Sequence, residues 1–149
     1  MEIYIDADGC PVKPEIFKVA ERYKMQVHVV ANGWIATPES PRVAMVLVAH
    51  GPDEADDWIV ERATAEDVVV TTDIPLAARC VAKGAAVLHP TGRRFTENDI
   101  GSALAMRDLL SRLRESGAVT GGPAPFEDRD RSQFLQSLDA VIQKALRKR

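Results

Sequence analysis

"VVVTTDIPLAARC", residues 68–80, contains the most strand-like run of this chain. A run of β-branched residues ends at an aspartate, Asp73, and a proline follows two positions later at Pro75. β-branched side chains favour strands, and a proline at the start of a helix loses no hydrogen bond. The segment therefore predicts a buried strand, a carboxylate at its end, and then a helix.

Strands and helices alternate on both sides of this segment. We expect strands within residues 1–7, 26–32, 44–50, 67–72 and 85–90, and helices within 13–25, 53–64 and 75–84. Such alternation predicts an α/β fold, in which helices cover both faces of an open parallel sheet. The right-handed crossover of each unit and the position of the acidic residues favour adjacent, parallel strands at 1–7 and 67–72.

The pattern changes after the last of these strands. Residues 96–115 indicate one long helix with Thr96 as its N-cap, 118–130 form a loop rich in Gly and Pro, and 131–149 form a C-terminal helix. The 149 residues suit a single domain spanning 1–149. The last helices are expected to pack on the sheet or to bridge to another subunit, so a homo-oligomer is an open alternative.

Composition narrows the function classes. With 19 basic and 22 acidic residues and a net charge of -3, the chain has no overall attraction for a polyanion, so any nucleic-acid contact needs a local patch. We expect a cytoplasmic protein, because the chain has only two cysteines and its first residues lack the basic and apolar pattern of a leader. We also expect no membrane span, because no apolar run approaches about 20 residues.

Acidic side chains are expected to gather at one edge of the sheet. Asp6 ends the first strand, Asp73 ends the strand within 67–72, and the helix between them opens with Glu54, Asp56 and Asp57. Ligands bind outside the carboxyl ends of parallel strands, where strand order reverses. Clustered carboxylates repel one another unless a divalent cation is present, and oxygen ligands favour Mg²⁺ or Mn²⁺. Taken singly, each acid also fits a helix cap or a turn.

Four motifs carry a resemblance to a known family. "DADGCPVK", "ADDWIVE", "TTDIPLA" and "HPTGRRFTENDIG" together resemble the YaiI/YqxD family of uncharacterised bacterial proteins, which is assigned to the PIN-like superfamily. "EADD" at a helix start and T-x-D at a strand end are similar to the metal motifs of 5′-nucleases and flap endonucleases. The resemblance spans nearly the whole chain. It implies a PIN-like three-layer fold with a mainly parallel five-stranded sheet in the order 3-2-1-4-5 and additional C-terminal helices.

The same resemblance implies a metal-dependent nuclease of RNA or DNA, with RNA the favoured partner and Mg²⁺ or Mn²⁺ the cofactor. The acidic motif positions that it assigns to metal binding are Asp6, Glu54, Asp56, Asp57 and Asp73, and we add Asp8 as a further candidate ligand. The subset that it assigns to catalysis is Asp6, Asp56, Asp57 and Asp73.

One position departs from the nuclease pattern. Many of these nucleases carry a further aspartate two residues after the one that ends the strand, and this chain has Pro75 there. Asp8 or Asp99 are candidates for the missing oxygen ligand. The departure keeps a second interpretation open, a non-catalytic PIN-like protein that binds metal or RNA or serves as a scaffold.

Basic residues near the same edge are candidates for phosphate binding. Lys13 lies at the start of the first helix, and Arg93 and Arg94 follow the last strand, where the alternative is a solvated loop. Arg129 and Arg131 are expected to pair with acidic neighbours in their own segment.

Two further chemistries are disfavoured. An aspartyl phosphatase of the haloacid-dehalogenase type would use Asp6 and Asp8 as its D-x-D motif, but its later acidic pair follows the Thr-bearing strand, whereas "EADD" precedes that strand here. Cys10 has acidic neighbours, which disfavour a thiolate, so we expect a structural residue and not a nucleophile.

Overall fold

The computed structural model describes residues 1–51, 53–101, 111 and 126–147, and its centre is a six-stranded sheet in the order β3-β2-β1-β4-β5-β6. The strands are β1 (Glu2–Asp6), β2 (Gln26–Ala31), β3 (Val43–Leu47), β4 (Val68–Val70), β5 (Ala86–Leu88) and β6 (Arg94–Phe95). The first five are parallel and follow the predicted order 3-2-1-4-5. The sixth was not predicted, and it pairs antiparallel with β5 at the sheet edge.

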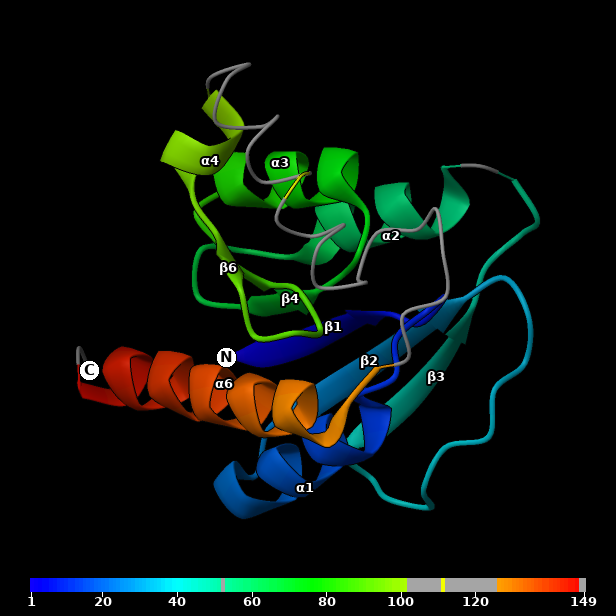
Figure 1. Ribbon diagram of the computed structural model, residues 1–149. Helices are drawn as coiled ribbons and strands as arrows, with labels where there is room; N and C mark the ends of the chain where they lie inside the picture. Colours follow the sequence, from blue (N-terminus) through cyan, green and yellow to red (C-terminus); the bar gives the residue numbers. More distant parts are fainter. Residues whose placement is uncertain (52, 102–110, 112–125, 148–149) are drawn as a thin grey trace.

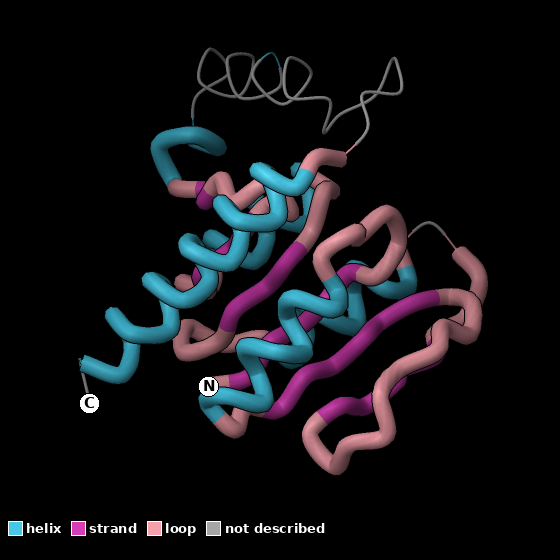
Figure 2. The backbone as a smooth tube through the Cα atoms, turned by 60° about the horizontal axis from the view of Figure 1, so that its bottom comes forward, coloured by secondary structure: helices cyan, strands magenta, loops and turns pink. Residues whose placement is uncertain are grey.

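Helices cover both faces of the sheet, as Figure 1 shows, with α2 and α3 above it and α1 and α6 below it. Their bounds are α1 (Lys13–Tyr23), α2 (Glu54–Arg62), α3 (Ile74–Ala82), α4 (Glu97–Gly101) and α6 (Asp128–Arg147). Figure 2 shows α1 and α6 side by side in front of the sheet. The predicted α/β class and three-layer arrangement are confirmed.

Each face of the sheet has its own apolar core. Ile3 and Ile5 of β1 point to the face that α1 and α6 cover, where Phe134 is also fully buried. Tyr4, between them in sequence, points to the opposite face with Ile59 of α2. This alternation is the two-residue period of a strand, and it fixes the register of β1 because a shift by one residue would exchange the two faces.

The C-terminal part differs in its boundaries from the prediction. Thr96 does cap α4, because its hydroxyl accepts the amide of Asp99 (3.2 Å) while the Asp99 carboxylate accepts the amide of Thr96 (3.3 Å). Residues 102–110 and 112–115 of the predicted long helix, residues 118–125 of the predicted loop, and residues 148–149 lie outside the described residues.

The last helix begins at Asp128, so the prediction of a loop up to residue 130 and a helix from 131 was wrong at this boundary. The reason is a local cap. Asp130 is buried, and its carboxylate accepts the backbone N–H of Glu127 at 3.1 Å, which starts the helix earlier.

The carboxyl ends of β1 and β4 lie side by side at an open edge of the sheet. The two strands pair in parallel, with Ile3 opposite Val68 and Ile5 opposite Val70, as predicted. The helix after β1 lies on one face and the helix after β4 on the other, which makes this the switch point where α/β folds bind ligands. Among the described residues, no helix has the length and apolar character needed to cross a membrane.

Candidate functional site

A buried carboxylate, Asp6, lies at the end of β1 and at the centre of the candidate site. It is 8% exposed, and its Oδ2 accepts a hydrogen bond of 2.8 Å from the hydroxyl of Thr71, just after β4. The Thr71 oxygen in turn accepts the backbone N–H of Asp73 at 2.9 Å. Because the amide occupies a lone pair of that oxygen, the hydroxyl proton is free to point at Asp6. The three residues form one chain of hydrogen bonds.

Asp73 has a structural role as well as a place in the site. It is the N-cap of α3, and its Oδ1 accepts the backbone N–H of Leu76 at 2.9 Å. A negative charge is favourable at a helix N-terminus. The capping alternative raised from the sequence is therefore observed, and the same carboxylate still acts on its neighbours electrostatically, raising the pKa of Asp6 and of Asp56.

Two of the carboxyl groups hold their protons unusually tightly. Burial raises the pKa of Asp6 from 3.8 to about 6, with smaller contributions from Asp56, Asp73 and Asp8, while the hydrogen bond from Thr71 acts in the opposite direction. Burial also raises the pKa of Asp56 to about 6, followed by the charge of Asp73. The predicted rise in pKa is confirmed, although desolvation is a larger cause than repulsion.

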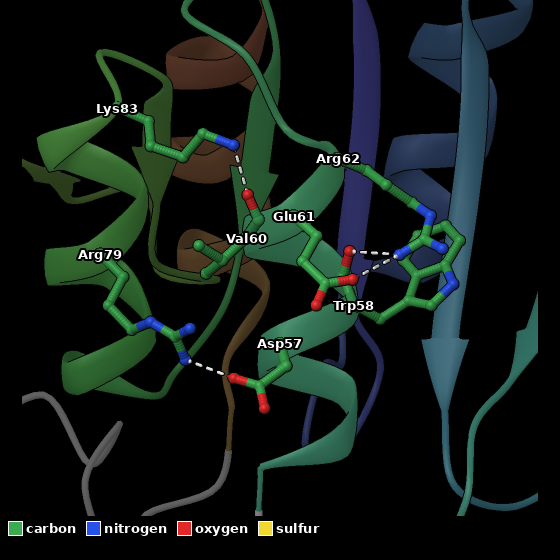
Figure 3. Close-up of polar contacts among 7 residues, drawn as sticks. All are labelled: Asp57, Trp58, Val60, Glu61, Arg62, Arg79 and Lys83. Atoms are coloured by element: carbon green, nitrogen blue, oxygen red, sulfur yellow. Dashed lines mark hydrogen bonds and ion pairs between the residues drawn. The ribbon is translucent and has the colours of Figure 1, made fainter.

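The remaining acids of α2 face elsewhere. Figure 3 shows Asp57 extending from α2 toward Arg79 of α3, and the two form an exposed ion pair of 2.9 Å. Glu54 is exposed, and its side chain lies over Gly51. On the opposite side of α2, Arg62 stacks over the Trp58 ring with its guanidinium carbon 4.1 Å from the ring centre. Asp56 is thus the acid of this helix that joins Asp6 and Asp73.

The loop after β1 brings a cation and a thiol to the edge of the site. The ammonium of Lys13 donates to the carbonyl of Cys10 at 2.8 Å, which holds the lysine over this loop. Burial raises the pKa of the Cys10 thiol to about 11, so the thiol is protonated at neutral pH. A nucleophilic role for Cys10 is disfavoured, in agreement with the prediction of a structural residue.

Asp8 and Asp99, the two candidates for the oxygen ligand that is missing at Pro75, lie in different places. Asp8 is exposed just beyond β1, and its charge contributes to the raised pKa of Asp6. Asp99 is instead engaged at the start of α4, where it accepts a hydrogen bond of 3.1 Å from Arg93. Only Asp8 of this pair is close enough to act on the buried carboxylate.

The arginines occupy several different places. Arg93 and Arg94 lie at the far side of β5, next to α6 and not beside Asp6. Arg129 pairs locally with Glu127 at 3.2 Å, as predicted. The local pairing predicted for Arg131 is wrong, because this residue reaches across to α1, 3.2 Å from the carboxylate of Glu15, and donates to the Pro11 carbonyl at 2.7 Å.

The site offers oxygen ligands without a finished metal geometry. In the part of the chain that the structure describes, no three Asp, Glu, His or Cys side chains are gathered into a group ready to hold an ion. The donor chemistry nevertheless fits Mg²⁺ or Mn²⁺, because the facing groups are carboxylates and a cation would favour the ionised form that burial disfavours. Asp56 and Asp73 would have to turn toward Asp6.

Sequence reasoning did not single out Thr71, which orients the central carboxylate. The signal was present in the T-x-D spacing of "TTD", because residues two apart on an extended chain point to the same side. Arg79 was also missed. Nothing in the sequence indicated that this residue of α3 would form an ion pair with Asp57 and direct it away from Asp6 and Asp73.

Comparison with known proteins identifies close relatives. A model of the family described as "Uncharacterized BCR, YaiI/YqxD family" matches residues 4–144. A UPF0178 protein of Azorhizobium caulinodans is 59% identical over 94% of this chain and 88% of the relative. A UPF0178 protein of Rhodospirillum rubrum is 55% identical, with 100% of both chains covered. No solved structure matches the chain.

Replacing Thr71 by valine tests the hydrogen-bond chain. Thr71→Val keeps the shape but leaves the Asp73 amide and the Asp6 carboxylate without their partner, so we expect the free energy of unfolding to fall by about 1–3 kcal/mol. Thr71→Ser is the matched control, since it keeps the hydroxyl and loses one methyl group, at a cost of about 1 kcal/mol or less. Urea unfolding measures both, and a serine variant less stable than the valine variant would contradict the assignment.

The raised pKa of Asp6 predicts a pH-dependent stability. The folded protein binds this proton more tightly than the unfolded chain does, so the contribution is favourable below about pH 4 and is lost as pH rises to about 6. Asp6→Asn cannot ionise and keeps an acceptor for Thr71. We expect this variant to be more stable than wild type above about pH 7, by up to about 3 kcal/mol, with the difference vanishing near pH 4. A difference that stays constant over this range in thermal unfolding would refute the assignment.

Proposed function

The chain belongs to the YaiI/YqxD family, and on that premise we propose that it is a metal-dependent nuclease that hydrolyses phosphodiester bonds of RNA or DNA. The observation that carries the proposal is that Asp56 and Asp73, from two other elements, lie close enough to Asp6 at the β1–β4 switch point for their charges to raise its pKa. A buried carboxylate surrounded by other carboxylates is costly for folding, and such arrangements concentrate at functional sites.

In this proposal Asp6, Asp56 and Asp73 would hold Mg²⁺ or Mn²⁺, with Asp8 at the exposed rim as a further oxygen donor. When bound, the ion would lower the pKa of a water molecule and stabilise charge on the phosphate. Thr71 keeps one Asp6 oxygen in a fixed orientation and leaves the other oxygen for a ligand. In the metal-free chain the pKa of Asp56 is about 6, so its proton would compete with the ion below about that pH.

The strand order supports a place in the PIN-like superfamily. β3-β2-β1-β4-β5 is the order that the resemblance implies, and the acids at the ends of β1 and β4 occupy corresponding motif positions. RNA is the preferred partner in this reading. The two buried, free cysteines suit a reducing compartment such as the cytoplasm.

A second candidate function is that of a non-catalytic PIN-like protein, which binds metal or RNA or serves as a scaffold without turnover. Pro75 is the observation that favours it, because a proline in the first turn of α3 stands where a nuclease would offer another carboxylate. The two candidates differ in whether the carboxylates matter for cleavage.

Asp73→Asn is the most informative variant for hydrolysis. Asparagine caps a helix as well as aspartate does, so α3 should be retained while one charge is removed from the site. With Mn²⁺ and labelled single- and double-stranded RNA and DNA, we expect wild type to cleave and this variant to lose activity at least about 100-fold.

Glu61→Gln is the matched control, because it makes the same chemical change on the exposed side of α2, where Glu61 pairs with Arg62. It should cleave as wild type does. Equal cleavage by wild type and Asp73→Asn would overturn hydrolysis at this site. If wild type and Asp73→Asn both bind RNA and neither cleaves it, the second candidate function is supported.

Metal binding has its own thermal test. An ion that binds only the folded protein stabilises it by mass action, by about 2.7 kcal/mol at a hundredfold excess over the Kd, or roughly 5–10 °C in Tm for a chain of this size. The shift should be absent in Asp6→Asn. It should also shrink below about pH 6, because protons on Asp6 and Asp56 compete with the ion. A Tm of wild type that millimolar Mn²⁺ and Mg²⁺ leave unchanged would count against a metal site.

A further inference from the structure

A polar groove runs between the β5–β6 hairpin and the first half of α6. The hairpin turn packs closely on the helix, since a Cβ on Gly92 would come within 2.8 Å of the Gln133 backbone. The adjoining groove has a volume of about 940 Å³. The hydrogen-bond donors along it include the side chains of Arg93, Arg94, Arg129, Gln133, Gln136 and Ser137. None of Asp6, Asp56 and Asp73 lines it.

The acids of the groove are already engaged by local donors. The Asp99 carboxylate accepts from Arg93 at 3.1 Å and from the backbone of Thr96 at 3.3 Å. The Asp130 carboxylate is buried and accepts a backbone N–H of its own helix turn at 3.1 Å. These contacts leave little acceptor capacity facing the groove, so its open surface is dominated by donors.

The cations of the groove keep free donor capacity. Arg94 is exposed on β6, and in the described part of the chain it forms no ion pair. Arg129 uses its Nε for an exposed pair with Glu127. An exposed pair of this kind contributes little free energy, so a ligand anion competes for the arginine at low cost.

Two buried donors in the hairpin have no acceptor among the described residues. One is the Nε–H of Arg93, a residue that lines the groove. The other is Nε2 of His89, which is 1% exposed. Nδ1 of His89 accepts the backbone N–H of Thr91 at 3.1 Å, so the neutral ring carries its proton on Nε2. Buried donors in native proteins are nearly always paired, so the Nε–H of Arg93, whose side chain lines the groove, marks a place for an acceptor from outside, whereas His89 does not line the groove.

We propose that this groove binds the phosphate group of a nucleotide or of a nucleic-acid strand. Guanidinium groups match phosphate oxygens in geometry and charge, and the amides and hydroxyl of α6 add neutral donors around them. Neither this groove nor the carboxylate site needs the other, because they share no residue. They do belong to one edge of the sheet, since the amide of Thr71 donates to the carbonyl of Leu88, at the end of β5, at 3.1 Å.

Binding without divalent metal separates this site from hydrolysis. A labelled RNA ten-mer with a 5′-phosphate is titrated into the full chain in EDTA, and unlabelled AMP, inorganic phosphate and the same ten-mer without its 5′-phosphate are the competitors. Arg94→Gln should weaken binding about tenfold or more, because one charge-assisted contact is lost. Arg22→Gln, an exposed arginine on α1, is the matched control and should bind as wild type does.

The competitors identify the source of the phosphate. If AMP and inorganic phosphate displace the probe, the groove binds a terminal or free phosphate. If only the ten-mer without a 5′-phosphate displaces it, the groove binds the phosphates of the strand backbone. Asp73→Asn should bind normally even if it is inactive, so failure of hydrolysis and failure of this groove are distinguishable. Equal binding by Arg94→Gln and wild type, with equal Tm values, or no binding of any phosphate probe would overturn the proposal.

Discussion

The parallel ladder between β1 and β4 pairs Ile3 with Val68 and Ile5 with Val70 in a fully buried part of the sheet. Every feature of the candidate site follows from it. The helices that follow the two strands leave toward opposite faces, so the carboxyl edge between them stays open. Asp6 ends one of these strands, and a single threonine after the other is in reach of it.

Burial, more than mutual repulsion, sets the chemistry of this edge. Asp6 is enclosed by the sheet and by the loop that follows it, and desolvation is the largest cause of its raised pKa. Thr71 partly offsets that cost with one hydrogen bond. When burial raises the pKa of a carboxyl group in this way, a nearby cation lowers that pKa strongly. The same cation would change the pKa of a solvated aspartate much less. The groove beside β6 has the opposite character, because its acids Asp99 and Asp130 are engaged, whereas Arg94 forms no ion pair among the described residues.

The sequence allowed the five parallel strands, their order and the meeting of Asp6 with an acid of α2 to be predicted, since these depend on periodicity, chain crossovers and motif positions. The sixth strand, Arg94–Phe95, is too short to leave a periodic pattern. Asp56 and Asp57 are neighbours on α2 and point about 100° apart, so only the packing of the helix decides that Asp56 acts on Asp6 while Asp57 pairs with Arg79. Arg131 likewise has acidic neighbours in sequence but finds its partner on α1, a contact that only tertiary packing decides.

We propose that carboxylates from β1, α2 and the start of α3 act together on one divalent ion. Anomalous diffraction from crystals soaked in Mn²⁺ is a direct test of this shared site. We expect a single strong peak within bonding distance of the carboxylates of Asp6, Asp56 and Asp73, and no such peak in Asp6→Asn crystals prepared in the same way. A wild-type crystal saturated with Mn²⁺ that shows no peak at these side chains, or shows one only elsewhere, would contradict the account.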